Sequence, residues 1–510
     1  MIQYKHLTLI FFCLTSLLLC NSAKAQFGTD SLPNVVLIYT DDLGYGDLSF
    51  SGGKIPTPNI DRLFEQGLSF SQAYSTAATC TPSRYSLLTG EYAWRAKGRG
   101  VAPGNASALI KSGRQTLASI FREAGYRTAV IGKWHLGLGG EKGPDWNGVI
   151  TPGPLDIGFD EAFLIPATGD RVPTVFVKDN RVLELDPNDP IAVSYGKKIG
   201  DWPTGKENPE LLTTKYSHGH DQTIVNGISR IGYMTGGKAA LWRDEDISDR
   251  LVEESKKFIS ASKDQPFFLY FSTHDIHVPR IAHERYQGKS GFGPRGDVIV
   301  QLDEAVGMLL EHLEKEGKLS NSIVIFSSDN GPVWDDGYVD QAFELIGDHD
   351  AAGGLRGGKY SAFEAGTRVP FAVFGRGIPE GKTQDAIFSQ IDLLSSFASA
   401  LNQKVDSKSA TDSEDHHQVL FGKTDEGRDG LVQEAIRGVL SYVSADGFKY
   451  IPPSEGEAIV PWGPKIETGF TKKPQLYSLM DKKESINLSD KMPKKRDELA
   501  RKLQTVIDKK

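Results

Sequence analysis

The sequence of 510 residues predicts an α/β fold in which helices sandwich a mostly parallel sheet, followed by a smaller C-terminal α+β domain. Short β-branched or aromatic runs alternate with amphipathic helical patterns, as is typical of βαβ units. The runs are apolar almost throughout, which suits strands that helices cover on both faces. We expect three parts: a signal peptide at 1–25, a large α/β domain at 26–415 and a C-terminal subdomain at 416–510.

The first 25 residues have the pattern of a secretory signal. Lys5 precedes an apolar run at 7–19, and Ala23-Lys24-Ala25 resembles a cleavage site. The run is too short for a membrane span, so the sequence predicts export to the periplasm or the exterior without a membrane anchor. The alternative is a lipoprotein anchored at Cys20, but the residue before an acylated cysteine is usually small and here it is leucine.

Charge and cysteine content narrow the class further. The formal net charge of -8 argues against nucleic acid as a partner, although an acidic protein can still hold a locally basic pocket. Cleavage after Ala25 would leave Cys80 as the single cysteine of the exported chain, so no intramolecular disulfide is expected. An unpaired cysteine in an exported protein calls for an explanation.

Polar clusters follow four of the predicted strands. In a parallel sheet, ligands bind beyond the carboxyl ends of the strands, so these clusters are expected to converge on one crevice. The strands and their clusters are 34–40 with Asp41 and Asp42, 128–131 with Lys133 and His135, 266–271 with His274 and His277, and 322–326 with Asp329 and Asn330.

Helices and a change of composition complete the outline. Residues 116–124 and 297–315 have helical periodicity, and a closing helix is expected from about Pro493. Residues 402–417 are polar and charged, as in an exposed connection, and the domain boundary is placed near them. Short alternating runs at 439–443 and 448–451 predict strands of the C-terminal subdomain.

The acidic clusters predict a metal site. Asp41, Asp42, Asp329 and Asn330 offer only oxygen donors. Such a set suits Ca²⁺ or Mg²⁺, whereas Zn²⁺ would call for imidazole or thiolate ligands.

Cys80 is predicted to lie at the N-terminus of a helix. Thr81 is the expected N-cap, Pro82 suits the first turn and Gly90 is a stop signal. The helix dipole and Arg84, one turn along, would surround a group at position 80 with positive potential. Taken alone, a lone cysteine is better interpreted as a buried small apolar side chain; the neighbouring polar clusters shift the balance toward a functional role.

Basic residues predict an anion pocket near this helix. Lys133 and His135 alternate along a segment expected to be extended, so both would project to one side. Lys359 lies in a glycine-rich loop that permits close backbone approach. Together with Arg84 and the histidines beyond the strands, these groups would form an oxyanion pocket with acid–base groups attached.

The motifs resemble those of the type I sulfatase family of the alkaline-phosphatase-like superfamily, in particular bacterial polysaccharide and glycosaminoglycan sulfatases. The resemblance covers nearly the whole exported chain. Its motifs are "TDDLGYGD" (40–47), "CTPSRYSLLTG" (80–90), "GKWHLG" (132–137), "SSDNG" (327–331), "LRGGK" (355–359) and, near the end, "PQLYSLMDKKESINLSD".

The resemblance implies that a separate maturation enzyme oxidises Cys80 to Cα-formylglycine, whose hydrate is the nucleophile. It further implies one Ca²⁺, with Mg²⁺ the less favoured ion, which also contacts residue 80 and a sulfate oxygen. The implied ligands are Asp41, Asp42, Asp329 and Asn330.

The resemblance also implies roles for the basic residues. Arg84 would stabilise the hydrate, and Lys133 and Lys359 would bind the sulfate group. His277 would protonate the departing sugar oxygen, and His135 would take a proton from the second hydroxyl of the hydrate to release sulfate. A hydrate serves better than an alcohol because its second hydroxyl lets the sulfated enzyme collapse.

The implied substrate is a sulfated carbohydrate with galactose- or N-acetylgalactosamine-type units. The long insert at 140–237 and the loop at 346–354 are expected to shape the sugar site, with His218, His220 and His349 as candidate contacts. The segment around His274 departs from the family pattern, which leaves the role of that residue open.

Three alternatives remain at this point. The chain could be a phosphoester or phosphonate hydrolase on the same fold, although Asp329-Asn330 stands where a dizinc site would have Asp-His. It could be a secreted sugar-binding protein without activity, although no expected catalytic position is lost. It could also be a cysteine hydrolase that uses Cys80 as a thiolate, but that leaves the acidic cluster without a purpose.

Overall fold

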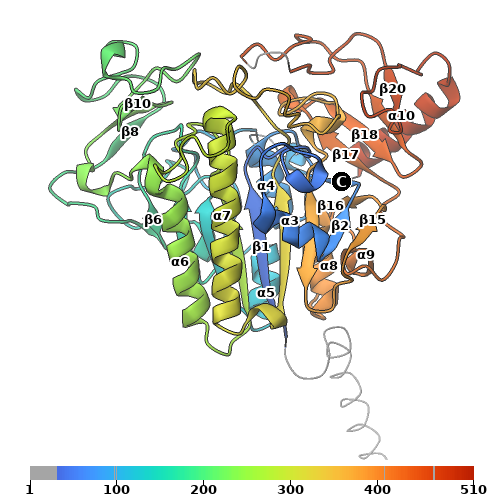
Figure 1. The fold of residues 1–510 in the computed structure, drawn as a ribbon, viewed down its shortest axis with the longest axis horizontal. Coiled ribbons are helices and arrows are strands. Elements are labelled where there is room, and N and C mark those ends of the chain that lie inside the picture. The colour runs from blue at the N-terminus through green and yellow to red at the C-terminus, as the bar shows by residue number, and fades with distance from the viewer. Residues whose placement is uncertain (1–31, 97, 99, 407, 463–465, 510) are drawn as a thin grey trace, which may run out of the picture.

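A sheet of ten strands forms the centre of the molecule (Figure 1). The computed structural model describes residues 32–510 except 97, 99, 407, 463–465 and 510. The predicted signal peptide at 1–25 and Cys20 lie outside the described residues. Across the sheet, the strand order is β15-β2-β14-β13-β1-β12-β4-β5-β6-β7.

The middle of this sheet is parallel and its edges are mixed. β1 (Asn34–Thr40) pairs in parallel with β12 (Phe267–Ser272) and with β13 (Ser322–Ser328), and β12 pairs in parallel with β4 (Arg127–Lys133). The remaining strands of the sheet are β2 (Leu68–Phe70), β5 (Glu161–Ile165), β6 (Val177–Lys178), β7 (Arg181–Val182), β14 (Phe371–Gly375) and β15 (Lys382–Gln384). The predicted fold class, a mostly parallel sheet, is confirmed.

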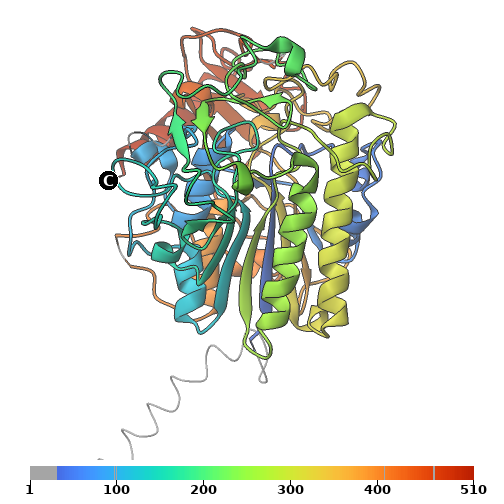
Figure 2. The same ribbon diagram turned by 90° about the vertical axis from the view of Figure 1, so that its left-hand side faces the viewer.

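Helices cover both faces of the sheet (Figure 2). One face packs against α3 (Pro58–Glu65), α6 (Ile247–Ala261) and α7 (Gly293–Lys315), and the other against α4 (Cys80–Thr89), α5 (Leu117–Glu123) and α8 (Leu393–Ala400). Alternate residues of β1 enter the two cores: Val35 and Leu37 lie in one, Val36 and Ile38 in the other. Both faces of β1 are therefore buried, which explains its continuous apolar sequence.

The C-terminal region forms a separate antiparallel sheet. Its strands run in the order β17 (Gly430–Glu434), β18 (Leu440–Ser444), β19 (Phe448–Ile451) and β20 (Gln475–Ser478). Helix α10 (Pro493–Asp508) packs Leu499 and Leu503 into its core. The sheet also contacts the large domain, since the amide of Ala78 donates to the carbonyl of Glu434. The boundary at 415/416 remains a prediction; it lies just before α9 (His417–Leu420).

The long segment between β7 and α6 is largely irregular. It holds three single-turn 3-10 helices and two short pairs of strands, β8 (Ala192–Ser194) with β11 (Tyr233–Thr235) and β9 (Ile224–Val225) with β10 (Ile228–Ser229). A further short pair joins β3 (Ala73–Tyr74) and β16 (Phe388–Ser389). None of the helices in the described residues is long and apolar enough to cross a membrane.

Candidate active site

The four polar clusters lie together at the carboxyl ends of adjacent strands. β13, β1, β12 and β4 are neighbours in the sheet, and the predicted ligand and acid–base residues follow the last residue of each or, for Lys133, occupy it. The structure therefore brings together residues from distant parts of the chain. Those that meet in this crevice are Asp41, Asp42, Lys133, His135, His277, Asp329 and Asn330, joined by Cys80 and Arg84 from α4 and by Lys359.

The buried side chains of Lys133 and Arg84 form ion pairs with Asp41 and Asp329. Lys133 Nζ lies 2.5 Å from Asp41 Oδ2. Arg84 donates from Nε to Asp329 Oδ2 at 2.9 Å, and its Nη2 forms an ion pair with the same oxygen at 2.7 Å. Arg84 also donates from Nη1 to Ser272 Oγ at 2.5 Å. Each of these charges is fully buried, so the pairing is needed to offset the cost of desolvation.

Asp42 is bound from two other sides. Its Oδ1 accepts from Asn330 Nδ2 at 2.8 Å, and its Oδ2 accepts from Lys359 Nζ at 2.8 Å. Asp42 has a positive φ of 60°, a turn conformation that aspartate tolerates better than most residues. This turn directs the side chain into the crevice beside that of Asp41.

The oxygen set fits a divalent cation. Among the described residues, Asp41 Oδ1 and Asn330 Oδ1 are buried and accept no hydrogen bond. Unsatisfied buried oxygens are costly unless a ligand completes them, and both belong to the predicted hard-cation set. His277 extends the group: one ligand atom from each of Asp41, Asp42 and His277 lies within 4.8 Å of the others.

The environment shifts the pKa values of the two aspartates in opposite directions. Burial raises the pKa of Asp41 well above its ordinary value, against the opposing influence of Lys133. Burial also acts to raise the pKa of Asp42, but the charges of Lys359 and Lys133 outweigh it and lower that pKa. A cation between them would favour the ionised form of both.

Cys80 is the first residue of α4, so the helix begins two positions earlier than the predicted N-cap at Thr81 implies. Thr79 is the N-cap, and its side chain makes no capping bond. The expectation that Thr81 caps the helix is wrong, because Thr81 Oγ1 donates to the carbonyl of His135 at 3.1 Å. Gly90 ends the helix in the left-handed conformation, as the sequence predicts.

His135 contacts Cys80 directly. Its Nδ1 lies 3.2 Å from Cys80 Sγ, and its Nε2 donates to the carbonyl of Ala102 at 2.8 Å. The expected extended segment from Lys133 to His135 is wrong, because His135 has a φ of 54°. This turn sends Lys133 toward the aspartates and His135 toward Cys80.

Burial disfavours the charged forms of Cys80, His135 and His277. Burial raises the pKa of the Cys80 thiol, despite the opposing effect of Lys133 and Lys359, which disfavours a thiolate nucleophile. Burial and Lys133 lower the pKa of His135 well below its usual value, and burial, Lys359 and Lys133 do the same for His277.

His277 and His274 have different surroundings. His277 donates from Nδ1 to the carbonyl of Val278 at 2.7 Å, which leaves Nε2 directed at the crevice, 3.9 Å from Asp42 Oδ2. His274 Nε2 instead accepts from the amide of Gly169 at 2.8 Å. Of the two, only His277 lines the cavity described next.

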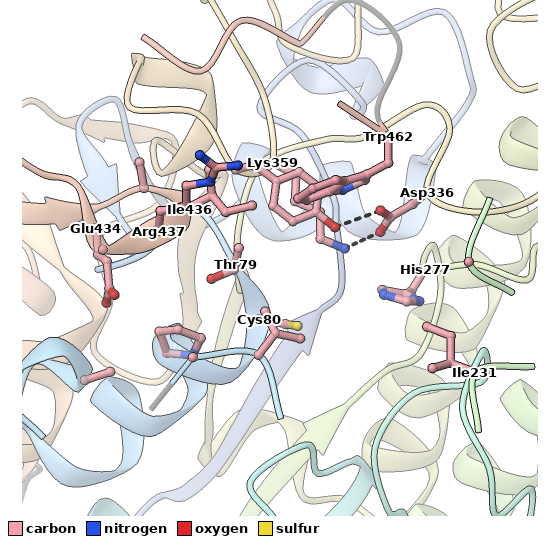
Figure 3. A pocket seen from close by; sticks show the side chains of 18 of the residues that line it. Thr79, Cys80, Ile231, His277, Asp336, Lys359, Glu434, Ile436, Arg437 and Trp462 are labelled. Atoms are coloured by element: carbon pink, nitrogen blue, oxygen red, sulfur yellow. Dashed lines mark hydrogen bonds and ion pairs between the residues drawn. The ribbon is translucent and has the colours of Figure 1, made fainter. Parts of the chain in front are cut away.

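A cavity of about 870 Å³ opens above Cys80 (Figure 3). The sulfur of Cys80 faces the space between Lys359 and His277, and residues of the C-terminal sheet line the opposite wall. His218 and His220 line the cavity, as expected for the insert. The expectation for His349 is wrong: it is buried away from the cavity, bonded from Nε2 to Asp47 Oδ1 at 2.9 Å.

Sequence reasoning did not single out four polar residues that line this cavity. They are Asp170, Arg171, Asp336 and Tyr360. Asp170 pairs with Arg171 and with His220 Nε2 at 2.9 Å, and Asp336 pairs with Lys359 at 2.7 Å. Tyr360 directly follows the "LRGGK" motif, which was a signal for it; the other three lie in loops without a motif.

The crevice at the carboxyl edge of the sheet combines buried oxygen donors with a cysteine at a helix N-terminus. The cationic side chains of Arg84, Lys133 and Lys359 lie around it. This combination is typical of a hydrolase of anionic esters. The sulfatase family model matches residues 33–403, and the chain therefore belongs to the sulfatase family. It is a sulfuric ester hydrolase, and enzymes of this family generally use formylglycine and a divalent metal, with which the buried acidic site is compatible.

Relatives support the assignment over most of the chain. The N-acetylgalactosamine-6-O-sulfatase of Bacteroides thetaiotaomicron is 52% identical over 476 residues, 93% of each chain. Human arylsulfatase A is 32% identical over 377 residues, which cover 72% of this chain and 63% of its own.

Solved structures agree with the sequence matches. A Bacteroides thetaiotaomicron structure described with the metabolism of multiple glycosaminoglycans has a TM-score of 0.92 and 51% identity, and the match covers 94% of this chain and 99% of that one. The phosphonate monoester hydrolase of Agrobacterium radiobacter shares the fold alone, with a TM-score of 0.54 and 18% identity over 93% of this chain and 95% of that one.

Proposed function

We propose that this sulfatase removes the 6-O-sulfate of N-acetylgalactosamine units in sulfated carbohydrates, with residue 80 as formylglycine. The observation that carries the mechanism is the place of Cys80, whose Sγ stands where the hydroxyl oxygens of the formylglycine hydrate would be. It contacts His135 at 3.2 Å at the end of a cavity that Lys359 and His277 also line. The substrate rests on the identity of 52% to a relative of that specificity.

A single Ca²⁺ is the proposed cation. Asp41, Asp42, Asp329 and Asn330 would hold it. Their donor atoms are all oxygens, and two of those oxygens accept no hydrogen bond from the described residues. When bound, it would supply positive charge that opposes the negative charge developing on the sulfuryl oxygens.

One hydroxyl of the hydrated aldehyde would attack sulfur, forming a new S–O bond as the bond between sulfur and the sugar oxygen breaks. Loss of the proton from the second hydroxyl would then re-form the aldehyde C=O, break the C–O bond to the sulfate group and release sulfate. His135 is placed to take that proton, because its Nε2 donates to Ala102 and its Nδ1 is therefore free to accept at position 80. Arg84 would stabilise the hydrate by fixing Asp329 beside it.

His277 would protonate the departing sugar oxygen. Its Nδ1 proton is committed to the carbonyl of Val278, so Nε2 is the nitrogen that exchanges a proton with the substrate. Burial, with Lys359 and Lys133, lowers its pKa well below the usual value. A bound sulfate group, paired with Lys133 and Lys359, would counter that effect and favour the protonated form.

Groups on the insert side would recognise the sugar. His220 Nε2 lies 2.9 Å from Asp170 Oδ2, and its Nδ1 lies 2.8 Å from the carbonyl oxygen of His218. Asp170, His220 and the partly buried Arg171 thus form a polar cluster beside the cavity. Such groups suit the hydroxyls of a hexose ring, and the remaining space suits an acetamido group.

Export and maturation complete the proposal. The leader at 1–25 would direct the chain to the periplasm or the exterior, and a maturation enzyme would oxidise Cys80 within the "CTPSR" segment.

The test is sulfate release by the matured enzyme from three monosaccharides: N-acetylgalactosamine 6-sulfate, its 4-sulfate isomer and N-acetylglucosamine 6-sulfate. We expect kcat/KM to be highest for the first by at least about tenfold, since one misplaced polar group in a buried site costs on the order of 1–3 kcal/mol. Equal rates on all three would refute the proposed substrate. Faster turnover of an aryl phosphate than of the matched aryl sulfate would refute the chemistry.

A further inference from the structure

We propose that Asp336 is a positioning residue for Lys359: with Tyr360, it holds the ammonium group at the sulfate position once a cation occupies the crevice. The inference deepens the proposed function and rests on it, because it concerns how the same site keeps a cationic group available to the sulfate. It assigns a role to a residue outside every motif that defines the site.

Lys359 stands between two carboxylates. Its Nζ donates to Asp42 Oδ2 at 2.8 Å and to Asp336 Oδ2 at 2.7 Å, and all three side chains are buried. The dashed lines in Figure 3 mark the two contacts at Asp336, from Lys359 and from Tyr360.

The two carboxylates differ in what else they must do. Asp42 belongs to the proposed cation set, so a bound cation would draw its oxygens and repel the ammonium group. Asp336 lines the cavity. It is not part of the group of ligand atoms that gather in the crevice, which come from Asp41, Asp42 and His277. With the cation in place, Asp336 is therefore the carboxylate partner left to Lys359. Without that partner, the ammonium would be buried and unpaired, or would compete with the cation for Asp42.

Tyr360 fixes the orientation of Asp336. Its hydroxyl donates to Asp336 Oδ1 at 2.7 Å, so each carboxylate oxygen has one partner and the plane of the group is set. Tyr360 has a φ of 78°, in the left-handed region, and its amide donates to the carbonyl of Ala78 at 2.7 Å. This costly turn lets the side chains of two consecutive residues, Lys359 and Tyr360, reach the same carboxylate.

A double-mutant cycle tests the inference with Asp336→Asn, Lys359→Gln and the double variant, each with formylglycine verified by mass. The first readout is kcat/KM on an aryl sulfate and on N-acetylgalactosamine 6-sulfate. We expect Asp336→Asn to lower kcat/KM by about 10- to 100-fold in the wild-type background, as for loss of a charge-assisted hydrogen bond, and by less than about twofold in the Lys359→Gln background.

The second readout needs no turnover: calcium chloride is titrated into the metal-free variants by calorimetry. In the wild-type background, Asp336→Asn should weaken calcium binding by roughly tenfold, because Lys359 then pairs with Asp42 alone. In the Lys359→Gln background, no ammonium group competes with calcium for Asp42. Any weakening of calcium binding that remains there reports only the loss of the negative charge of Asp336, and the cycle subtracts it.

Equal effects of Asp336→Asn in both backgrounds, on either readout, would overturn the inference and indicate that Asp336 acts on the sugar or on the fold. Asp335→Asn is the matched control one residue away and should leave kcat/KM within about twofold. If Asp336→Asn fails to fold, Tyr360→Phe replaces it and should show a smaller coupling to Lys359, about three- to fivefold. A wild-type enzyme active only on the aryl sulfate would refute the proposed sugar while leaving the cycle measurable.

Discussion

Two buried charge clusters in this protein use the same residue types but are built differently. In the catalytic crevice, Asp41 Oδ1 and Asn330 Oδ1 have no hydrogen-bond donor among the described residues. In the second cluster, Asp47 accepts twice at each oxygen: Oδ1 from Arg295 and His349 at 2.6 and 2.9 Å, and Oδ2 from Arg295 and the amide of Gly44 at 2.8 and 2.7 Å.

The difference separates a binding site from a structural tie. Burial alone would raise the pKa of Asp47, but Arg295 and His349 lower it to about 2, so this carboxylate is ionised and fully satisfied by the protein itself. In the crevice, burial leaves the pKa of Asp41 well above its ordinary value. The crevice thus holds oxygens that accept no hydrogen bond from the described residues, whereas both oxygens of Asp47 are satisfied. Substitutions in the two clusters should therefore have opposite consequences for activity and stability.

The largest expected effect is at the nucleophile. Cys80→Ala should lower kcat by at least about 10⁴-fold, because no other group can supply the hydrated aldehyde. The free energy of unfolding should fall by no more than about 1–2 kcal/mol, since a small buried side chain is only shortened. Sulfate release and urea denaturation measure the two quantities, and a fully active variant would exclude residue 80 as the nucleophile.

The next effect is on cation binding. Asp41→Asn should lower kcat/KM by about 10²- to 10³-fold and weaken calcium binding, because the cation loses a charged ligand. Without metal, the free energy of unfolding should fall by only about 1–2 kcal/mol, less than for the matched change at Asp47, because the buried Lys133 still lies 3.8 Å from the carboxylate of Asp329. Calorimetric calcium titration and denaturation of the metal-free protein provide the comparison. A large loss of stability would mean that this cluster too is a structural tie.

The matched change in the second cluster should do the reverse. Asp47→Asn should lower the free energy of unfolding by about 3–5 kcal/mol, because it leaves the buried guanidinium of Arg295 without its carboxylate. The kcat/KM of the fraction that remains folded should stay within about fivefold of the wild type. Denaturation curves combined with active-site-normalised kinetics distinguish the cases; loss of activity without loss of stability would contradict the contrast.

The smallest expected effect is a dependence of stability on pH through His274. Burial, assisted by Lys133, lowers the pKa of His274 to about 4 in the folded protein, against about 6.5 in the unfolded chain. Between these values the unfolded chain binds a proton that the folded protein does not. The contribution of His274 to the free energy of unfolding is thus fully present above pH 6.5 and falls by about 3 kcal/mol as the pH drops to 4.

His274→Gln is the matching variant, because its side-chain oxygen can still accept from the amide of Gly169 but does not titrate. Urea denaturation at pH values from 4 to 7 should show a shallower pH slope for the variant than for the wild type. Identical slopes would show that His274 is not a buried neutral acceptor.

The sequence predicted the centre of the fold well and its periphery poorly. β1, β12 and β13 are six or seven residues long and each holds an apolar run of four or five because both faces are buried, and that pattern is visible without a structure. The convergence of the clusters follows from parallel pairing alone. The edge strands β7 and β15 are only two and three residues long and carry no pattern of that kind.

The same limit applies within the site. Motif residues beyond the strand ends could be named from the sequence, but Asp336 and Asp170 reach the cavity only because of the paths of their loops. His349 and His220 look alike in sequence, and both pair with a carboxylate. Only the structure shows that the partner of His349 is Asp47, away from the cavity, while the partner of His220 lines it.

The most direct test of the account is the mass of the tryptic peptide that runs from Leu63 to Arg84, taken from protein isolated from its natural host. The account predicts that the sulfur of Cys80 is replaced by oxygen with loss of two hydrogens, as in formylglycine. An intact thiol in a preparation that releases sulfate would contradict it, because turnover would then proceed without the hydrated aldehyde on which the proposed mechanism depends.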